Sequence, residues 1–242
     1  MKFALIGYGK MGKEIEQVIR DTAAGEVILK VTEETADTLT AQNLRQCDVA
    51  IEFTQPDAAV ANIFRCLDAG VPVVVGTTGW FSRLEEVKAK CNECHGAVFY
   101  SPNFSIGVNI FWALSRKLAQ LINIQPQYKI HITEIHHTEK KDAPSGTAVK
   151  TAEILLEELQ RYKQWQLCDE SALAAPDVIP VTALRQPQVP GTHTLTVSSG
   201  IDQITLTHEA KSRRGFAEGA VLAAKWLVGK KGVFEMKDML HI

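Results

Sequence analysis

The chain has 242 residues, of which 45% are hydrophobic and 22% charged, as in an ordinary globular protein. At about 150 residues per domain, this length predicts one large domain or two modest ones that need no disulfide or metal for stability. The formal net charge of -2 gives no sign of a nucleic-acid partner. Apolar runs are too short for a membrane span or a signal peptide, so we expect a cytoplasmic protein with no membrane partner.

Strand and helix patterns alternate over the first hundred residues. A helix expected over 13–21 follows the first strand, and another over 58–69 ends at Gly70, a residue typical of helix C-termini. The strands between are short and continuously apolar, as buried parallel strands are. They are expected at 2–6, 27–31, 48–53, 71–75 and 97–100. This alternation predicts an α/β fold with a Rossmann-type doubly wound parallel sheet.

The pattern changes near residue 106. Polar and apolar residues alternate in several segments, which predicts antiparallel strands with one wet face. These segments are 128–137, 193–199 and 203–209, with helices expected at 108–122, 147–162 and 216–228. The proline-rich stretch 169–190 predicts a long loop. We therefore expect a dinucleotide-binding domain over 1–105 plus 215–242, with an α+β domain inserted at 106–214.

A glycine loop joins the first predicted strand to the first predicted helix, in the pattern G-x-G-x-x-G. Gly7 allows the tight turn, Gly9 lets the backbone approach a pyrophosphate, and Gly12 allows close packing of strand and helix. The N–H groups that begin the helix also favour phosphate. The cofactor-binding residues expected here are Gly7, Tyr8, Gly9, Lys10, Met11 and Gly12.

An acidic pair follows the second predicted strand, about 20 residues beyond the loop as the dinucleotide pattern requires. Glu33 or Glu34 is expected to accept a hydrogen bond from a ribose 2′-hydroxyl, and a carboxylate there repels a 2′-phosphate. Lys10 would offset part of that repulsion. We therefore expect a nicotinamide cofactor, with NADH weakly preferred over NADPH.

The segment 134–148, EIHHTEKKDAPSGTA, holds the densest chemistry of the chain. Ser145 has the side chain of a helix N-cap, so the N–H groups of Gly146 and Thr147 would face an anion beside the cations Lys140 and His137. A carboxylate-bearing substrate suits this group. A histidine here would also supply the proton that accompanies hydride transfer.

Two metal-type patterns are disfavoured. His131, Glu134, His136 and His137 hold metal-ligand atoms, but adjacent strand residues point to opposite faces and the neighbouring lysines repel a cation. The sequence 91–95 matches C-x-x-C-H, a haem or redox pattern, but its spacing is that of an ordinary helix end. We expect free thiols and no metal.

The segment 134–148 resembles the signature of the 4-hydroxy-tetrahydrodipicolinate reductase family, also called dihydrodipicolinate reductase. Further family blocks follow in order at 53–56, 76–79, 103–109 and 216–220. The resemblance implies NAD(P)H-dependent reduction of 4-hydroxy-tetrahydrodipicolinate to tetrahydrodipicolinate, in lysine and diaminopimelate biosynthesis. It also implies a homotetramer, built by the sheets of the inserted substrate-binding domain.

Site roles follow from the same resemblance. His136 would donate the proton with Lys140 as second catalytic group, and His137, Gly146 and Thr147 would bind the carboxylates of a small dicarboxylate. The nicotinamide side would be formed by Gly76, Thr77, Thr78, Ser101, Pro102, Asn103 and Phe104. Gln55 replaces a residue that is basic in some members, and Arg213 and Arg214 either attract the substrate or are ordinary solvated charges. The alternatives are another Rossmann-fold amino-acid or sugar dehydrogenase, or a non-catalytic NADH sensor.

Overall fold

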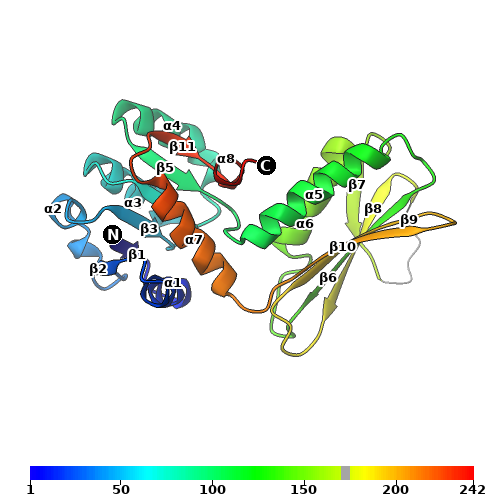
Figure 1. Cartoon of the computed structure of the whole chain (residues 1–242), viewed down its shortest axis with the longest axis horizontal. Coiled ribbons are helices and arrows are strands. Elements are labelled where there is room, and N and C mark those ends of the chain that lie inside the picture. The colour runs from blue at the N-terminus through cyan, green and yellow to red at the C-terminus, as the bar shows by residue number, and fades with distance from the viewer. Residues whose placement is uncertain (170–174) are drawn as a thin grey trace. The chain divides into compact units, whose positions relative to one another are not determined.

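A computed structural model describes residues 1–169 and 175–242 (Figure 1). The chain forms two compact units, one made of Met1–Ile106 with Arg214–Ile242 and the other of Gly107–Arg213. Among the described residues, no helix combines the length and the apolar character needed to cross a membrane. Part of the predicted loop 169–190, residues 170–174, lies outside the described residues.

Six parallel strands form the sheet of the first unit, in the order β11-β5-β4-β3-β1-β2. The strands are β1 (Lys2–Ile6), β2 (Glu26–Val31), β3 (Val49–Glu52), β4 (Val73–Val75), β5 (Ala97–Tyr100) and β11 (Gly232–Phe234). The predicted Rossmann-type parallel sheet is confirmed, and β11 is an addition that the sequence pattern did not predict. Strand order reverses between β1 and β3, and ligands of such sheets bind beyond the carboxyl ends of the strands at that point.

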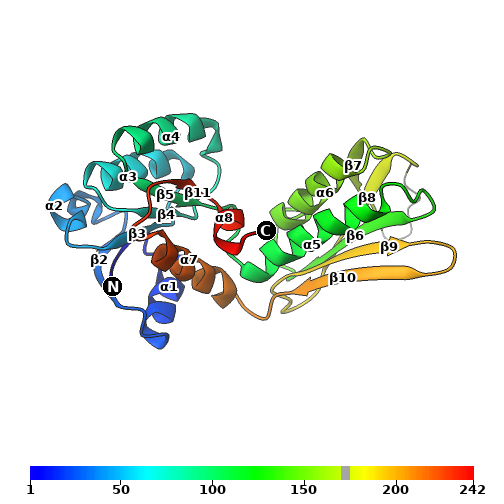
Figure 2. The same cartoon turned by 45° about the horizontal axis from the view of Figure 1, so that its top comes forward.

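Helices cover both faces of this sheet (Figures 1 and 2). Val60 and Val87 lie in the core cluster on one face, whereas Ile15 and Ala220 belong to the cluster on the other. Apolar residues on both sides explain why the central strands are continuously apolar. The helices are α1 (Lys10–Asp21), α2 (Ala41–Leu44), α3 (Pro56–Asp68), α4 (Leu84–Glu93), α7 (Arg214–Leu227) and α8 (Met236–Leu240), with 3₁₀ turns η1 (Ala36–Thr38) and η2 (Phe81–Arg83).

The second unit is a mixed five-stranded sheet in the order β10-β9-β6-β8-β7. Its strands are β6 (Lys129–His136), β7 (Gln164–Leu167), β8 (Val178–Arg185), β9 (Thr192–Ser198) and β10 (Gln203–Glu209). β6 pairs antiparallel with β9 and parallel with β8. The inserted α+β unit is therefore confirmed as a fold.

Two helices, α5 (Ile106–Ile122) and α6 (Gly146–Glu158), lie side by side over one face of this sheet (Figure 2). The Trp112 indole N–H donates to the Thr151 hydroxyl across the pair, at 3.2 Å. Burial alternates along β6, so that Ile130 and Ile132 face the helices together with the even-numbered residues after them. This alternation places Glu134 and His136 on the covered face.

Two expectations for this unit were wrong. Residues 178–185, expected in a loop, form β8 between β6 and β7, because prolines around and within a short apolar run hide its strand character. The helix expected over 147–162 ends at Glu158. Leu159 and Tyr162 leave the helix but remain buried, so their apolar side chains continue the helical pattern beyond the helix itself.

Candidate active site

The glycine loop between β1 and α1 is shaped by contacts that exclude side chains. Gly7 has a φ of +93°, and a Cβ built on it would lie 2.0 Å from the Phe53 carbonyl oxygen. A Cβ on Gly12 would lie 2.4 Å from the Gly7 carbonyl oxygen. By contrast, a Cβ on Gly9 would meet no described atom within 4 Å, which leaves this side of the loop open to a ligand.

Two cavities flank the glycine loop at the carboxyl ends of the strands. The larger, of about 710 Å³, has Glu33 in its wall, and the smaller, of about 440 Å³, has Lys10. Residues expected to bind the cofactor divide between them: Gly7, Tyr8, Gly9 and Glu33 line the larger; Gly9, Lys10, Met11, Gly76, Thr77 and Thr78 line the smaller. The two cavities share Gly9 and Thr54 in their linings, and two neighbouring cavities of these volumes suit an elongated dinucleotide.

The structure does not bring every expected cofactor residue to these cavities. Ser101 and Phe104 are buried, and the segment from Ser101 to Phe104 is absent from both linings within the described chain. The Ser101 hydroxyl donates to the Asn103 carbonyl at 2.7 Å, so the segment forms its own turn after β5. Asn62 and Arg65 also line the larger cavity. They were not predicted as site residues, because the apolar spacing that indicates a helix gives no information about which of its residues contact a ligand.

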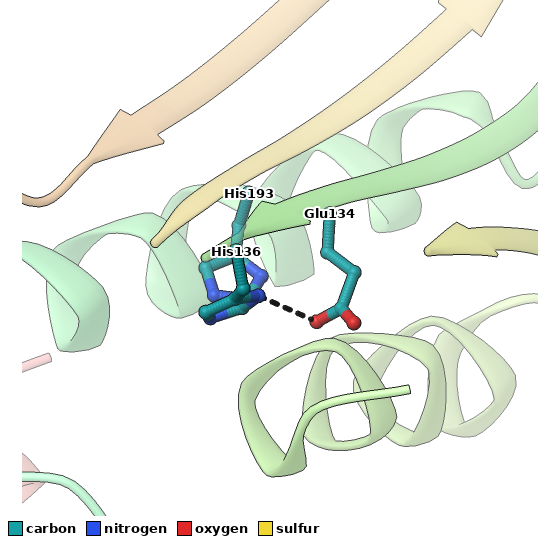
Figure 3. A group of neighbouring side chains, drawn as sticks. All are labelled: Glu134, His136 and His193. Carbon is teal, nitrogen blue, oxygen red and sulfur yellow. Dashed lines mark ion pairs between the residues drawn. The ribbon is translucent and has the colours of Figure 1, made fainter. Parts of the chain in front are cut away.

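In the second unit, three titratable side chains gather on the helix-covered face of the sheet (Figure 3). Glu134 and His136 project from β6, and His193 is the direct cross-strand neighbour of Glu134 on β9. His136 Nδ1 lies 3.4 Å from Glu134 Oε2, and the two imidazole rings meet edge to face at 5.1 Å. All three are buried.

Glu134 is a buried carboxylate held by several donors. The backbone N–H of Ser145 donates to Oε2 at 3.0 Å, and Arg185 Nη1 lies 3.3 Å from Oε1. Burial alone would raise the pKa of Glu134, but hydrogen bonds from His136 and Ser145 outweigh it and lower this pKa to about 2. Glu134 is therefore ionised at neutral pH and orients the His136 ring.

His193 is neutral at the same pH. Burial lowers the pKa of His193 to about 4, assisted by the nearby charge of His136. His193 was not predicted from the sequence as part of this group. The alternation along β9 could have indicated it, since His193, Leu195 and Val197 point to the same face of the strand and all three are buried.

The loop from β6 to α6 carries the cations. Lys140 Nζ pairs with Asp142 at 2.7 Å, while Arg185 donates to the backbone oxygens of Lys140 at 3.3 Å and of Asp142 at 2.7 Å. Arg185 thus ties this loop to Glu134. It lies on β8, inside the segment expected to be a loop, and was missed for that reason.

The start of α6 is built as expected. The Ser145 hydroxyl accepts from the Ala148 N–H at 3.3 Å, which confirms it as N-cap. A Cβ on Gly146 would meet no described atom within 4 Å, so the backbone of Gly146 and Thr147 can be approached closely. The helix dipole and Lys140 make this corner favourable for an anion.

The group of Glu134, His136 and His193 has the donor atoms of a metal site, within 4.8 Å of one another. The set of His131, Glu134, His136 and His137, which was considered from the sequence and disfavoured, is not assembled, because His131 lies on the opposite face and contacts the Thr182 hydroxyl at 2.9 Å. Arg185 already pairs with Glu134, and the charge of Lys140 acts on His193. These cations disfavour a divalent metal ion here.

Arg214, which was considered as a group that attracts the substrate, forms two ion pairs. Its guanidinium pairs with Asp21 at 2.7 Å and with Glu218 at 2.8 Å, both in the first unit. The pair with Asp21 joins the start of α7 to the end of α1, and the pair with Glu218 lies within α7.

Two family models match the chain: "Dihydrodipicolinate reductase, N-terminus" over residues 1–104 and "Dihydrodipicolinate reductase, C-terminus" over residues 107–240. The 4-hydroxy-tetrahydrodipicolinate reductase of Christiangramia forsetii is 44% identical over 242 residues, covering 99% of this chain and 98% of the relative. The enzyme of that name from Methanoregula boonei is 40% identical over 197 residues, 81% of this chain and 75% of the relative. A dipicolinate-bound dihydrodipicolinate reductase from Paenisporosarcina sp. TG-14 shares the fold, with a TM-score of 0.76, 23% identity and 99% of each chain covered.

Proposed function

The chain belongs to the dihydrodipicolinate reductase family, and on this premise we propose that it reduces 4-hydroxy-tetrahydrodipicolinate to tetrahydrodipicolinate in lysine and diaminopimelate biosynthesis. One observation identifies the residues that would perform this reaction. A buried carboxylate–histidine pair, Glu134 and His136, stands beside a helix start suited to a carboxylate, in a chain that also has a dinucleotide loop.

His136 supplies the proton in this proposal. Glu134 Oε2 lies 3.4 Å from Nδ1 and its negative charge stabilises the charged ring, and the proton is proposed to leave from Nε2. The nicotinamide, when bound, supplies a hydride to the adjacent substrate atom. The 4-hydroxyl leaves as water together with a hydrogen of the neighbouring ring carbon, which gives the dihydropyridine, and the hydride and the proton then add one H₂ equivalent to that ring. Lys140, held by Asp142, is the proposed second donor.

The substrate carboxylates are assigned to the start of α6. Thr147→Val should raise the KM for the substrate about tenfold or more, because a hydrogen bond to a charged group is lost, while kcat changes little. Thr147→Ser keeps the hydroxyl and is the matched control. Steady-state kinetics at saturating NADH measure both, and an unchanged KM in Thr147→Val would contradict the assignment.

The preferred cofactor is proposed to be NADH. Glu33 lines the larger cavity where an adenosine ribose would lie, and its carboxylate repels a 2′-phosphate. Wild type should therefore show the higher kcat/KM with NADH, and Glu33→Gln should raise kcat/KM for NADPH several-fold with a smaller effect for NADH. Arg65 shares this cavity, so a strong NADPH preference in wild type would transfer the ribose contact to that cation and reject the role of Glu33.

The activity itself is tested by following NADH consumption with freshly prepared 4-hydroxy-tetrahydrodipicolinate. Absence of turnover in pure protein with both NADH and NADPH would reject the reductase.

We also propose a cytoplasmic homotetramer formed through the second unit. The face of its sheet opposite α5 and α6 carries threonines, with the Thr194 and Thr207 hydroxyls 3.2 Å apart across β9 and β10. The cysteines are free thiols, which suits a reducing compartment. Light scattering should give four times the chain mass, and a monomer would contradict the assembly.

A further inference from the structure

We infer that Glu52 is a positioning residue that fixes the Thr54 hydroxyl as a hydrogen-bond acceptor for a ribose hydroxyl of the dinucleotide. The inference rests on the proposed nicotinamide cofactor. Glu52 ends β3 and lies in register with Ile6 of β1 and Val75 of β4, at the point where strand order reverses. Its side chain is 0% exposed and lines neither cavity, so it can act on a ligand only through its neighbours.

Donors converge on one oxygen of this carboxyl group. Glu52 Oε1 accepts from the Thr54 backbone N–H at 3.1 Å, from the Thr54 hydroxyl, and from Asn62 Nδ2 at 3.5 Å. An oxygen surrounded by three donors carries no proton itself, whatever the charge of the carboxyl group. The Thr54 hydroxyl must therefore give its proton to Glu52.

Because its proton is used, the Thr54 hydroxyl can form further hydrogen bonds only as an acceptor. One lone pair of Oγ1 accepts from Asn62 Nδ2 at 3.3 Å, which leaves one lone pair for a ligand. Thr54 is half-buried and lines both cavities beside the glycine loop. A ribose hydroxyl is a donor that matches this lone pair, whereas a phosphate oxygen, which only accepts, does not.

The same network joins the loops after β3 and β4. The Thr54 N–H also donates to the Thr77 hydroxyl oxygen at 2.7 Å, and the Thr77 carbonyl accepts from the Trp80 indole at 2.8 Å. Burial raises the pKa of Glu52, against the hydrogen bonds from Thr54, Thr77 and Asn62. A neutral carboxyl group would keep Oε1 as the accepting oxygen, so the positioning survives protonation.

NADH binding to four single variants and one double variant of the full chain tests the inference. Glu52→Leu and Thr54→Val should each raise the Kd for NADH about 3- to 10-fold, the effect of one hydrogen bond. Glu52→Gln keeps an accepting oxygen and Thr54→Ser keeps the hydroxyl, so both should bind within about twofold of wild type. In the Glu52→Leu, Thr54→Val double variant the loss should equal that of one single variant, because both remove one interaction. Fluorescence titration gives Kd, and kcat at saturating NADH should stay near wild type.

Several results would overturn the inference. Thr54→Val removes no buried charged group, so its folding is not affected in that way. Normal NADH affinity in Thr54→Val would show that Thr54 accepts no hydrogen bond from the ligand. A Glu52→Gln protein as weak as Glu52→Leu would contradict positioning by an accepting oxygen, as would a lower melting temperature of Glu52→Leu with unchanged Kd. Failure of wild type to bind NADH and NADPH would overturn the proposed function together with this inference.

Discussion

Replacing His136 by glutamine is expected to lower kcat about 10²–10⁴-fold, the usual contribution of a positioned acid or base. Glutamine matches the reach of histidine and can accept or donate hydrogen bonds, but it cannot release a proton near neutral pH. Glu134 would remain ionised beside it, held by Ser145 and Arg185. The affinity for NADH should be unchanged, because the glycine loop lies in the first compact unit and His136 in the second.

Steady-state kinetics and NADH fluorescence titration separate these two effects. His95→Gln is the matched control, since His95 is an exposed residue that follows α4 and should tolerate the same change without loss of kcat. Weakened NADH binding in His136→Gln would assign this histidine a structural role. Nearly normal turnover would show that another group, with Lys140 as the first candidate, supplies the proton.

The fold of the first unit was predictable because its signals are local. Continuous apolar runs such as 71–75, a glycine loop and a C-terminal Gly70 each act within a few residues, and packing on both sheet faces reinforces them. The last strand, β11, has only three residues and depends on parallel pairing with β5, more than 130 residues earlier. A pattern of that length cannot distinguish a strand from a loop.

The candidate site was predictable in its motif and not in its supporting contacts. His136 and the Ser145 N-cap lie in one continuous segment, whereas His193 reaches Glu134 only through the register of β6 with β9. Arg185 reaches Glu134 through β8, the strand whose prolines hid it. Alternation shows which residues share a face, but the partner across the sheet depends on loop lengths and pairing that no local pattern contains.

Acidification from pH 7 to pH 4 should destabilise this protein in a way that depends on His193. A histidine in the unfolded chain has an ordinary pKa of 6.5, whereas burial lowers the pKa of His193 to about 4 in the folded state. Between these values the unfolded state binds the additional proton, so stability is present above pH 6.5 and is lost as the pH falls towards 4. The difference corresponds to about 3 kcal/mol in the free energy of unfolding.

Urea unfolding at pH 7 and pH 4 of wild type and His193→Phe measures this contribution. Phenylalanine fills a similar volume without titrating, so the loss of stability between the two pH values should be about 3 kcal/mol smaller in the variant. His95→Phe changes an exposed histidine and should leave the wild-type pH dependence intact. Glu134 does not confound this comparison, because its folded pKa of about 2 places most of its own loss below pH 4.5. Equal pH dependence in wild type and His193→Phe would mean that His193 takes up its proton inside the folded protein, beside Glu134, at the same pH as in the unfolded chain.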